Sequence, residues 1–194
     1  MTEKRQFTIF EQLRNIYKAS RSFWFLKLFK KKHTMNFKLK ERIMLAVTEV
    51  NGCALCSYVH TKLALKAGLN DEAIKELLQG DLEGIPKEEA LAVLFAKDYA
   101  YNRELLDHEY YAKLIDTYGK HKARAILGVT HMITMTNGMG IALGLLKRTL
   151  TFKHVKGSCI LNELLIPLLT MMFFPTFLIL NLFIFPFYLL KLRK

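Results

Sequence analysis

The C-terminal part of the chain carries the feature that most limits how it can fold. The run from Leu164 to Leu190 contains 27 residues and no charged side chain. As one helix it would be about 40 Å long, against a hydrocarbon core of roughly 30 Å in a bilayer. Three prolines within it, Pro167, Pro175 and Pro186, would kink such a helix. The run predicts a membrane-contacting helix, as one tilted span or as a broken or interfacial helix; burial in a larger core is the other possibility.

The basic residues of the chain are concentrated on either side of an acidic middle. The formal net charge is +12, with +9 in residues 1–42, −3 in residues 43–146 and +6 in residues 147–194. A uniformly basic domain would suggest nucleic acid, whereas basic segments beside an apolar run suggest anionic lipid headgroups. We therefore expect membrane lipid as a partner of the C-terminal segment and no nucleic acid. Basic residues are more numerous before the run than after it, so we expect the rest of the chain to face the cytoplasm.

Apolar residues recur at helical spacing through most of the chain, and no strand pattern stands out. We expect an all-α fold, a helical bundle followed by a C-terminal hydrophobic membrane helix. The expected helices are at about 9–29, 38–50, 53–67, 71–78, 87–101, 107–118 and 120–150. The sequence divides into a basic amphipathic N-terminal arm (1–36), a helical core (37–150) and a basic-flanked hydrophobic tail (151–194). Two roles suit the arm equally: lying on the membrane surface, or packing across an oligomer interface.

Two of the three cysteines are spaced C-x-x-C. Cys53 and Cys56 follow a turn signal at Asn51-Gly52, and Cys159 stands alone. Three cysteines are too few for a secreted disulfide scaffold, and the N-terminus lacks an apolar signal core, so we expect a reducing, cytosolic environment. On a helix, Cys53, Cys56 and His60 would fall within about 60° of one another.

This arrangement is suited to thiol redox chemistry, which requires a thiolate. A helix N-terminus favours negative charge, and a histidine one turn along can accept a proton. A carboxylate can orient that histidine, and Glu41 and Glu49 are both available; their spacing alone does not choose between them. Redox work is favoured over two buried structural cysteines. It is also favoured over a metal site, because C-x-x-C-x-x-x-H supplies only three zinc ligands and a fourth would have to be Glu41, His131 or Cys159.

The same residues resemble a known signature. Glu41, eleven intervening residues, Cys53-x-x-Cys56, three residues and His60 are similar to the pattern of alkylhydroperoxidase D and its relatives in the carboxymuconolactone decarboxylase superfamily. Residues 63–72 and 132–137 are also similar to the family. The resemblance covers about Phe23 to Leu150.

The resemblance implies a role for each of the four residues. Cys56 would attack the peroxide and become a sulfenic acid, Cys53 would resolve it to a disulfide, and His60 with Glu41 would form the proton relay. An external dithiol reductant protein would regenerate the pair, the chain would form a homo-oligomer, and neither a cofactor nor a metal is expected. The best-known relatives carry a second histidine between the cysteines, where this chain has Ala54-Leu55. The decarboxylase branch of the superfamily works without the cysteine pair.

The function expected from these observations is a membrane-tethered, thiol-dependent peroxidase that reduces hydroperoxides. The first alternative is a dithiol-disulfide oxidoreductase or redox sensor serving a membrane partner, which the missing histidine favours. The second is a non-enzymatic metal-binding or scaffolding membrane protein. Outside the site, we expect His131 to be a satisfied core histidine and Cys159 to be a spectator thiol.

Overall fold

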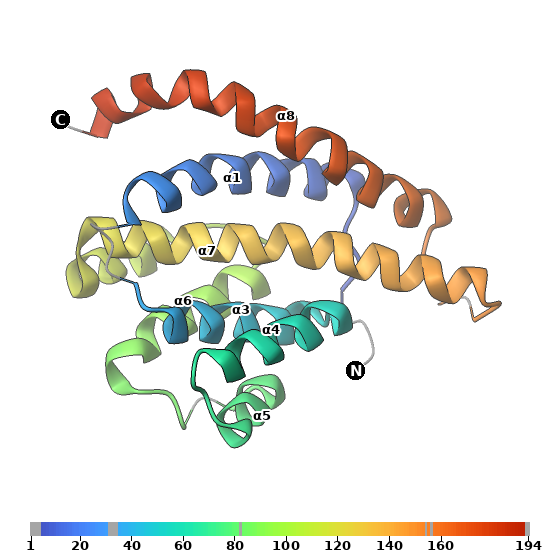
Figure 1. Ribbon diagram of the computed structural model, residues 1–194, viewed down its shortest axis with the longest axis horizontal. Helices are drawn as coiled ribbons and strands as arrows, with labels where there is room; N and C mark the ends of the chain where they lie inside the picture. The colour runs from blue at the N-terminus through green and yellow to red at the C-terminus, as the bar shows by residue number, and fades with distance from the viewer. Residues whose placement is uncertain (1–4, 31–34, 82, 154, 156, 193–194) are drawn as a thin grey trace.

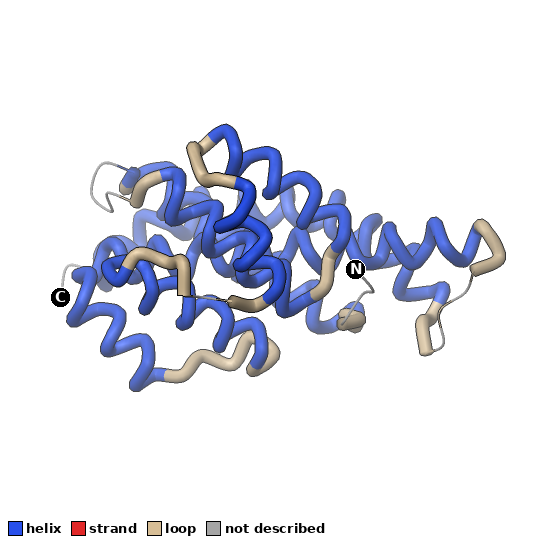
Figure 2. The backbone as a smooth tube through the Cα atoms, turned by 90° about the horizontal axis from the view of Figure 1, so that it is seen from below, coloured by secondary structure: helices blue, strands red, loops and turns tan. Residues whose placement is uncertain are grey.

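The computed structural model describes residues 5–30, 35–81, 83–153, 155 and 157–192, with side chains as far as residue 184. Within these ranges the chain forms helices and no strand, which confirms the all-α prediction. Figures 1 and 2 show these helices from two sides, linked by loops. The helices are α1 (Ile9–Leu28), α3 (Phe37–Asn51), α4 (Ala54–Lys66), α5 (Asp71–Gln79), α6 (Lys87–Tyr101), α7 (His108–Leu150) and α8 (Ile160–Leu192).

Local signals in the sequence explain where the helices begin and end. Thr8 and Glu11 form a reciprocal capping box at the start of α1, and the Asn70 side chain caps α5. Gly52 ends α3 in the left-handed conformation, with φ of 79°. The two helices expected at 107–118 and 120–150 are continuous as α7 but are divided at Gly119, whose φ of 77° and ψ of 156° are not helical.

The helices are stacked in layers around α7. Figure 1 shows α8 outermost, then α1, then α7 along the length of the molecule, with α3, α4, α5 and α6 on the far side of α7. Contacts between elements agree, since α7 touches α1, α8, α3, α4 and α6. The main core lies where α3, α6 and α7 meet and contains fully buried side chains such as Leu45, Phe95 and Ile126.

The N-terminal arm is part of this bundle. Helix α1 packs between α7 and α8, and its polar residues Gln12, Asn15 and Ser20 are buried. Gln12 Nε2 donates hydrogen bonds to the Met135 carbonyl oxygen at 3.0 Å and to Thr170 Oγ1 at 2.9 Å. Within the described residues, the partners of α1 are therefore helices of its own chain. The boundary at residue 36 stays a prediction.

The tail forms one helix that lies along α1. Helix α8 continues through Pro167 and Pro175 as one helix. The prolines therefore do not break it into separate segments. Trp24 Nε1 donates to the Leu178 carbonyl oxygen at 2.8 Å, and Asn181 Nδ2 donates to Ser20 Oγ at 2.9 Å. The tail is thus docked on the bundle rather than standing apart from it.

Two helices among the described residues are long and apolar enough to cross a membrane. In the most apolar 18-residue window of α7, 67% is buried within the protein. In the corresponding window of residues 160–184 of α8, only 22% is buried. Burial identifies α7 as the central core helix. Helix α8 instead exposes large apolar side chains along one face, including Leu164, Leu168, Met171 and Phe183. Length and composition, taken together with burial, leave α8 as the candidate for membrane contact.

Candidate redox site

The cysteine pair sits at the first turn of α4. Cys53 is the N-cap residue, and its Sγ accepts a hydrogen bond from the Cys56 backbone N–H at 3.2 Å. The left-handed Gly52 immediately before it ends α3 and redirects the chain. Cys53 and Cys56 form a disulfide, with their Cα atoms 5.3 Å apart. The pair therefore occupies the positive end of the helix dipole, where a thiolate is stabilised once the disulfide is reduced.

The two sulfur atoms are covered by α7. Cys53 is fully buried and Cys56 is 7% exposed. Cys56 Sγ lies 3.6 Å from the carbonyl oxygen of Thr136. Gly140, one turn further along α7, leaves room for both sulfurs, because a Cβ added there would lie 2.6 Å from Cys53 Sγ and 2.9 Å from Cys56 Sγ. The small residue at position 140 lets α4 and α7 approach closely at the disulfide.

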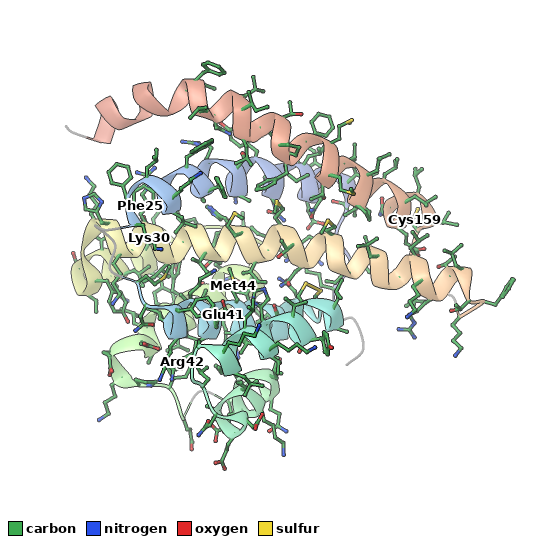
Figure 3. The ribbon with its side chains drawn as sticks, viewed as in Figure 1. Phe25, Lys30, Glu41, Arg42, Met44 and Cys159 are labelled. Atoms are coloured by element: carbon green, nitrogen blue, oxygen red, sulfur yellow. A yellow bond between two sulfur atoms is a disulfide. The ribbon has the colours of Figure 1, made fainter. Side chains whose placement is uncertain are left out.

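His60 and Glu41 form the polar side of the site. His60 lies on α4 one turn after Cys56, and its Nδ1 is 2.7 Å from Glu41 Oε2 on α3. The Glu41 side chain is fully buried, and the His60 side chain is 14% exposed. When a carboxylate accepts a hydrogen bond from Nδ1–H of a neutral histidine, the other ring nitrogen, Nε2, is left as the basic one. The second carboxylate oxygen, Oε1, has Lys40 Nζ at 4.0 Å. Figure 3 labels Glu41 on α3 and shows the disulfide as a yellow bond.

The structure separates the two carboxylates between which the sequence could not choose. Glu49 lies 3.5 Å from Lys97 Nζ of α6, away from His60. It is 8% exposed, so it is a buried ion-pair residue and not a solvent-facing one. Glu41 is the carboxylate that reaches the histidine. All four residues that the sequence singled out, Cys53, Cys56, His60 and Glu41, lie around the start of α4 and the facing part of α3; their catalytic roles stay a prediction.

Two parts of the site were missed by the reasoning from sequence. Thr136 and Gly140 come from α7, about 80 residues beyond the cysteines. Gly138, Gly140 and Gly144 are visible in the sequence, and a glycine in a helix interior weakens the helix. A glycine that no turn requires is also a sign of close backbone approach, and that is its function at position 140.

His131 lies outside the redox site, as expected. Its Nδ1 is 2.9 Å from Ser22 Oγ, which joins α7 to α1. Burial lowers the pKa of His131 to about 3, and the positive charges of Lys18 and Arg21 contribute to the shift. The ring is therefore neutral at physiological pH. Asn137, on the same helix, accepts a hydrogen bond from Thr48 Oγ1 at 3.2 Å in the core.

Comparison with known families supports the resemblance read from the signature. Residues 16–97 match the model of the carboxymuconolactone decarboxylase family. Over this part, which is less than half of its length, the chain is similar to that family. The match contains Glu41, Cys53, Cys56 and His60, and it starts inside α1, within the stretch predicted to be a separate arm. Neither the curated proteins nor the solved structures gave a match to the chain.

The metal-binding alternative requires at least three ligating side chains gathered around one point. Across the described part of the chain, no three or more His, Cys, Asp and Glu side chains gather in an arrangement that could hold a metal ion. Of the three fourth ligands considered from the sequence, His131 pairs with Ser22 and Cys159 is an exposed free thiol at the start of α8, whereas Glu41 lies in the site and contacts His60. The metal-binding alternative stays untested.

The close approach at Gly140 leads to a first prediction. In Gly140→Ala, the new methyl group would overlap both sulfur atoms, and α4 must move away from α7 to relieve it. We expect closure of the disulfide by an added oxidant to slow by about 10-fold or more, because a shift of about 1 Å in reacting groups has effects of this size. The measurement is the rate of disulfide formation in reduced protein, followed by thiol labelling and mass spectrometry.

Gly128→Ala is the matched control for this prediction. It places a methyl group on the same helix, against Leu26 and Ser22 of α1 at 3.3–3.5 Å, away from the sulfurs. We expect it to leave the closure rate within about 2-fold of the wild type. Equal slowing in both variants would show that Gly140 acts through the general stability of α7 and not through the sulfurs.

Proposed function

We propose that this protein is a thiol-dependent peroxidase of the alkylhydroperoxidase type. The observation that supports this best is the contact of 2.7 Å between the buried Glu41 carboxylate and His60, one helical turn from a cysteine pair at a helix N-terminus. Purely structural cysteines need neither an oriented histidine nor a buried carboxylate. The family whose model matches residues 16–97 includes enzymes of this kind. The particular activity of this chain is the part to be tested.

The proposed reaction begins with the reduced pair. His60 accepts the Cys56 proton at Nε2, and the thiolate attacks the terminal oxygen of the hydroperoxide. The O–O bond breaks, the leaving alkoxide takes a proton from His60 and departs as an alcohol, and Cys56 becomes a sulfenic acid. The Cys53 sulfur then attacks the Cys56 sulfur, and the leaving hydroxide takes up the Cys53 thiol proton and departs as water. The products are one alcohol, one water and the Cys53–Cys56 disulfide seen in the structure.

An external dithiol would return the enzyme to its starting state by thiol-disulfide exchange. Cys53 is fully buried and Cys56 is 7% exposed, so exchange begins with attack on Cys56. The side chain of Leu55, between the two cysteines, is exposed and available to contact such a partner. A dithiol-disulfide oxidoreductase that never meets peroxide is the second candidate. It is favoured by one observation, the Ala54-Leu55 dipeptide in place of the second relay histidine.

A single-turnover experiment separates the two candidates. Reduced protein is mixed with one equivalent of an organic hydroperoxide, and the alcohol and the remaining thiols are measured over time. The peroxidase proposal predicts one alcohol formed for each Cys53–Cys56 disulfide, much faster than with free cysteine. If the pair exchanges readily with a small dithiol while the alcohol forms no faster than in free cysteine, the peroxidase assignment is wrong and the oxidoreductase assignment stands.

We further propose that α8 holds the enzyme at a membrane, with the catalytic helices on the cytoplasmic side. Helix α8 is docked on α1, so a span across the bilayer would draw charged residues of α1 such as Arg14, Lys18 and Arg21 into hydrocarbon. The exposed apolar face of α8 is better suited to lie in the interfacial plane. Basic residues just before α8, Lys147, Arg148 and Lys153, are exposed and suited to anionic headgroups.

The interfacial placement predicts how the chain binds vesicles. Replacing Leu164, Leu168 and Met171 by Glu, one turn apart on the exposed face, should weaken binding of the full chain to anionic vesicles by at least about 100-fold. The matched control replaces the exposed Leu94, Tyr101 and Leu105 by Glu, and we expect binding to change by less than about 3-fold. Alkaline carbonate should release the wild-type protein from membranes; retention after carbonate would show that α8 spans the bilayer instead.

A further inference from the structure

An open apolar groove lies beside the redox site, between α1, α3 and α7. Its volume is about 680 Å³, which is within the range of small-molecule sites in proteins. Phe23, Met44, Val129 and Met132 form its apolar wall. Methionine side chains are flexible and adapt to chains of varied shape. The groove is thus suited to an elongated apolar ligand.

One side of the groove is basic. Lys27, Lys30 and Lys40 lie along it, and no acidic side chain is among the described residues that line it. Figure 3 labels Lys30, just after α1, and Met44 on α3. Lys27 and Lys30 are exposed, so their ammonium groups can reach a ligand that enters from solvent or from a membrane surface. An apolar wall next to three cations matches an amphiphile with an anionic head.

Of the helices that form the groove, α1 and α7 also contact α8, and α3 and α7 carry residues of the redox site. At one side, the Phe23 ring packs edge-on against Phe174 of α8 with centroids 6.5 Å apart, and Met132 belongs to the same apolar cluster. At the other side, Met44 is one helical turn from Glu41. Met132 is likewise one turn from Thr136, whose carbonyl oxygen contacts Cys56 Sγ. One turn is about 5.4 Å, so Met44 and Met132 of the groove wall lie one helical turn from residues of the redox site.

We propose that this groove binds a free long-chain fatty acid, with the acyl chain on the apolar wall and the carboxylate held by Lys27, Lys30 and Lys40. Fatty-acid hydroperoxides are then the substrates that the site favours. The binding step stands on the groove alone, and the substrate step rests on the proposed peroxidase function. In that step Cys56 takes the terminal peroxide oxygen, the O–O bond breaks, and the hydroxy fatty acid leaves.

The first arm of the test measures binding without peroxide chemistry. Trp24 is the single tryptophan of the chain and is next to Phe23, with Lys27 over its ring at 5.7 Å. A long-chain fatty acid brominated on its acyl chain should quench Trp24 fluorescence of the full chain in zwitterionic lipid discs. The methyl ester of the same acid partitions into lipid but lacks the carboxylate. We expect saturable quenching by the acid with at least 10-fold higher affinity than by the ester.

The variants for this arm change charge and leave the core intact. The double substitution Lys27→Glu with Lys30→Glu should weaken binding of the acid by at least 10-fold and leave binding of the ester unchanged. The matched control, Lys113→Glu with Lys120→Glu, reverses two exposed charges of α7 away from the groove and should have no effect. Equal quenching by acid and ester in all three proteins would overturn the groove as a fatty-acid site. The proposal would also be overturned if the wild-type protein bound no fatty acid and the groove variant differed from it in oligomer mass. That result would assign the groove to a second copy of the chain.

The second arm measures turnover with a small dithiol as reductant. For a free fatty-acid hydroperoxide, the groove variant should raise KM by at least 10-fold, while kcat/KM for hydrogen peroxide stays unchanged. If the fatty acid binds but no peroxide of any kind is reduced, the proposed function fails and the groove stands. If hydrogen peroxide is reduced but the acid neither binds nor shows the KM effect, the groove proposal fails and the function stands. The free acid would also be overturned as occupant if the enzyme preferred an intact phospholipid hydroperoxide to the free fatty-acid hydroperoxide and the groove variant left that preference unchanged.

Discussion

Replacing Cys56 by Ser should abolish hydroperoxide reduction, lowering the rate constant by at least about 10³-fold. The reason is that Cys56 is the sulfur with residual exposure and lies one turn from His60, whereas Cys53 is fully buried as the N-cap. A serine hydroxyl has the shape of the thiol but does not become the nucleophile that cleaves an O–O bond. The measurement is peroxide consumption by stopped flow under excess dithiol.

Cys53→Ser should behave differently, because Cys53 enters only after the peroxide has reacted. We expect the first turnover to proceed within about 3-fold of the wild-type rate and later turnovers to stop or become limited by the added thiol. Cys159→Ser is the control, because Cys159 is exposed and free. We expect this substitution to leave the rate unchanged. Full loss in Cys53→Ser together with full activity in Cys56→Ser would reverse the assignment of the two sulfurs.

Glu41→Gln should lower kcat/KM for hydroperoxide by about 10²- to 10³-fold. The carboxylate fixes the proton on His60 Nδ1 at 2.7 Å, so that Nε2 is free to accept the thiol proton. A glutamine amide in the same place can donate to Nδ1 and favour the tautomer that carries its proton on Nε2, and it cannot stabilise an imidazolium. The measurement is kcat/KM together with the rate at which the reduced Cys56 reacts with an alkylating reagent at neutral pH, and both should fall.

Glu49→Gln is the matched control for this prediction. It removes the same charge from the same helix, but Glu49 pairs with Lys97 and not with the histidine. We expect its kcat/KM to stay within about 3-fold of the wild type in folded protein, even if thermal stability falls. If both variants lose activity equally, the effect comes from the net charge or stability of α3 and not from a relay through His60.

The local features of the fold were predictable because short-range physics sets them. Asn70 and Gly52 mark helix ends through side-chain capping and left-handed backbone, and these signals lie within a few residues of the boundary. Cys56 and His60 share α4, so their relative placement follows from 100° per residue, whereas Cys53, expected inside this helix, is its N-cap with extended backbone. The fold class and three of the four candidate residues needed nothing beyond such spacing.

The remaining features depend on contacts between distant segments. The choice of Glu41 over Glu49 requires the angle between α3 and α4, which the turn at Asn51-Gly52 sets and the sequence does not state. Gly140 covers the sulfurs only because α7 crosses α4. For α8, hydrophobicity predicts an apolar environment but does not distinguish lipid from protein. Its contacts with α1 show that one side packs on protein, and the exposed apolar side is the one proposed to contact lipid.

The central claim is that the Cys56 sulfur is the atom that takes oxygen from a hydroperoxide. The most direct measurement uses Cys53→Ser, in which the oxidised sulfur cannot be resolved. The reduced variant is treated with one equivalent of hydroperoxide in the presence of a sulfenic-acid trap, and the labelled residue is located by peptide mass spectrometry. We expect one adduct per chain, on Cys56, formed at the rate of peroxide loss. A Cys56 that remains a free thiol after the peroxide has been consumed, or an adduct confined to Cys159, would contradict the claim.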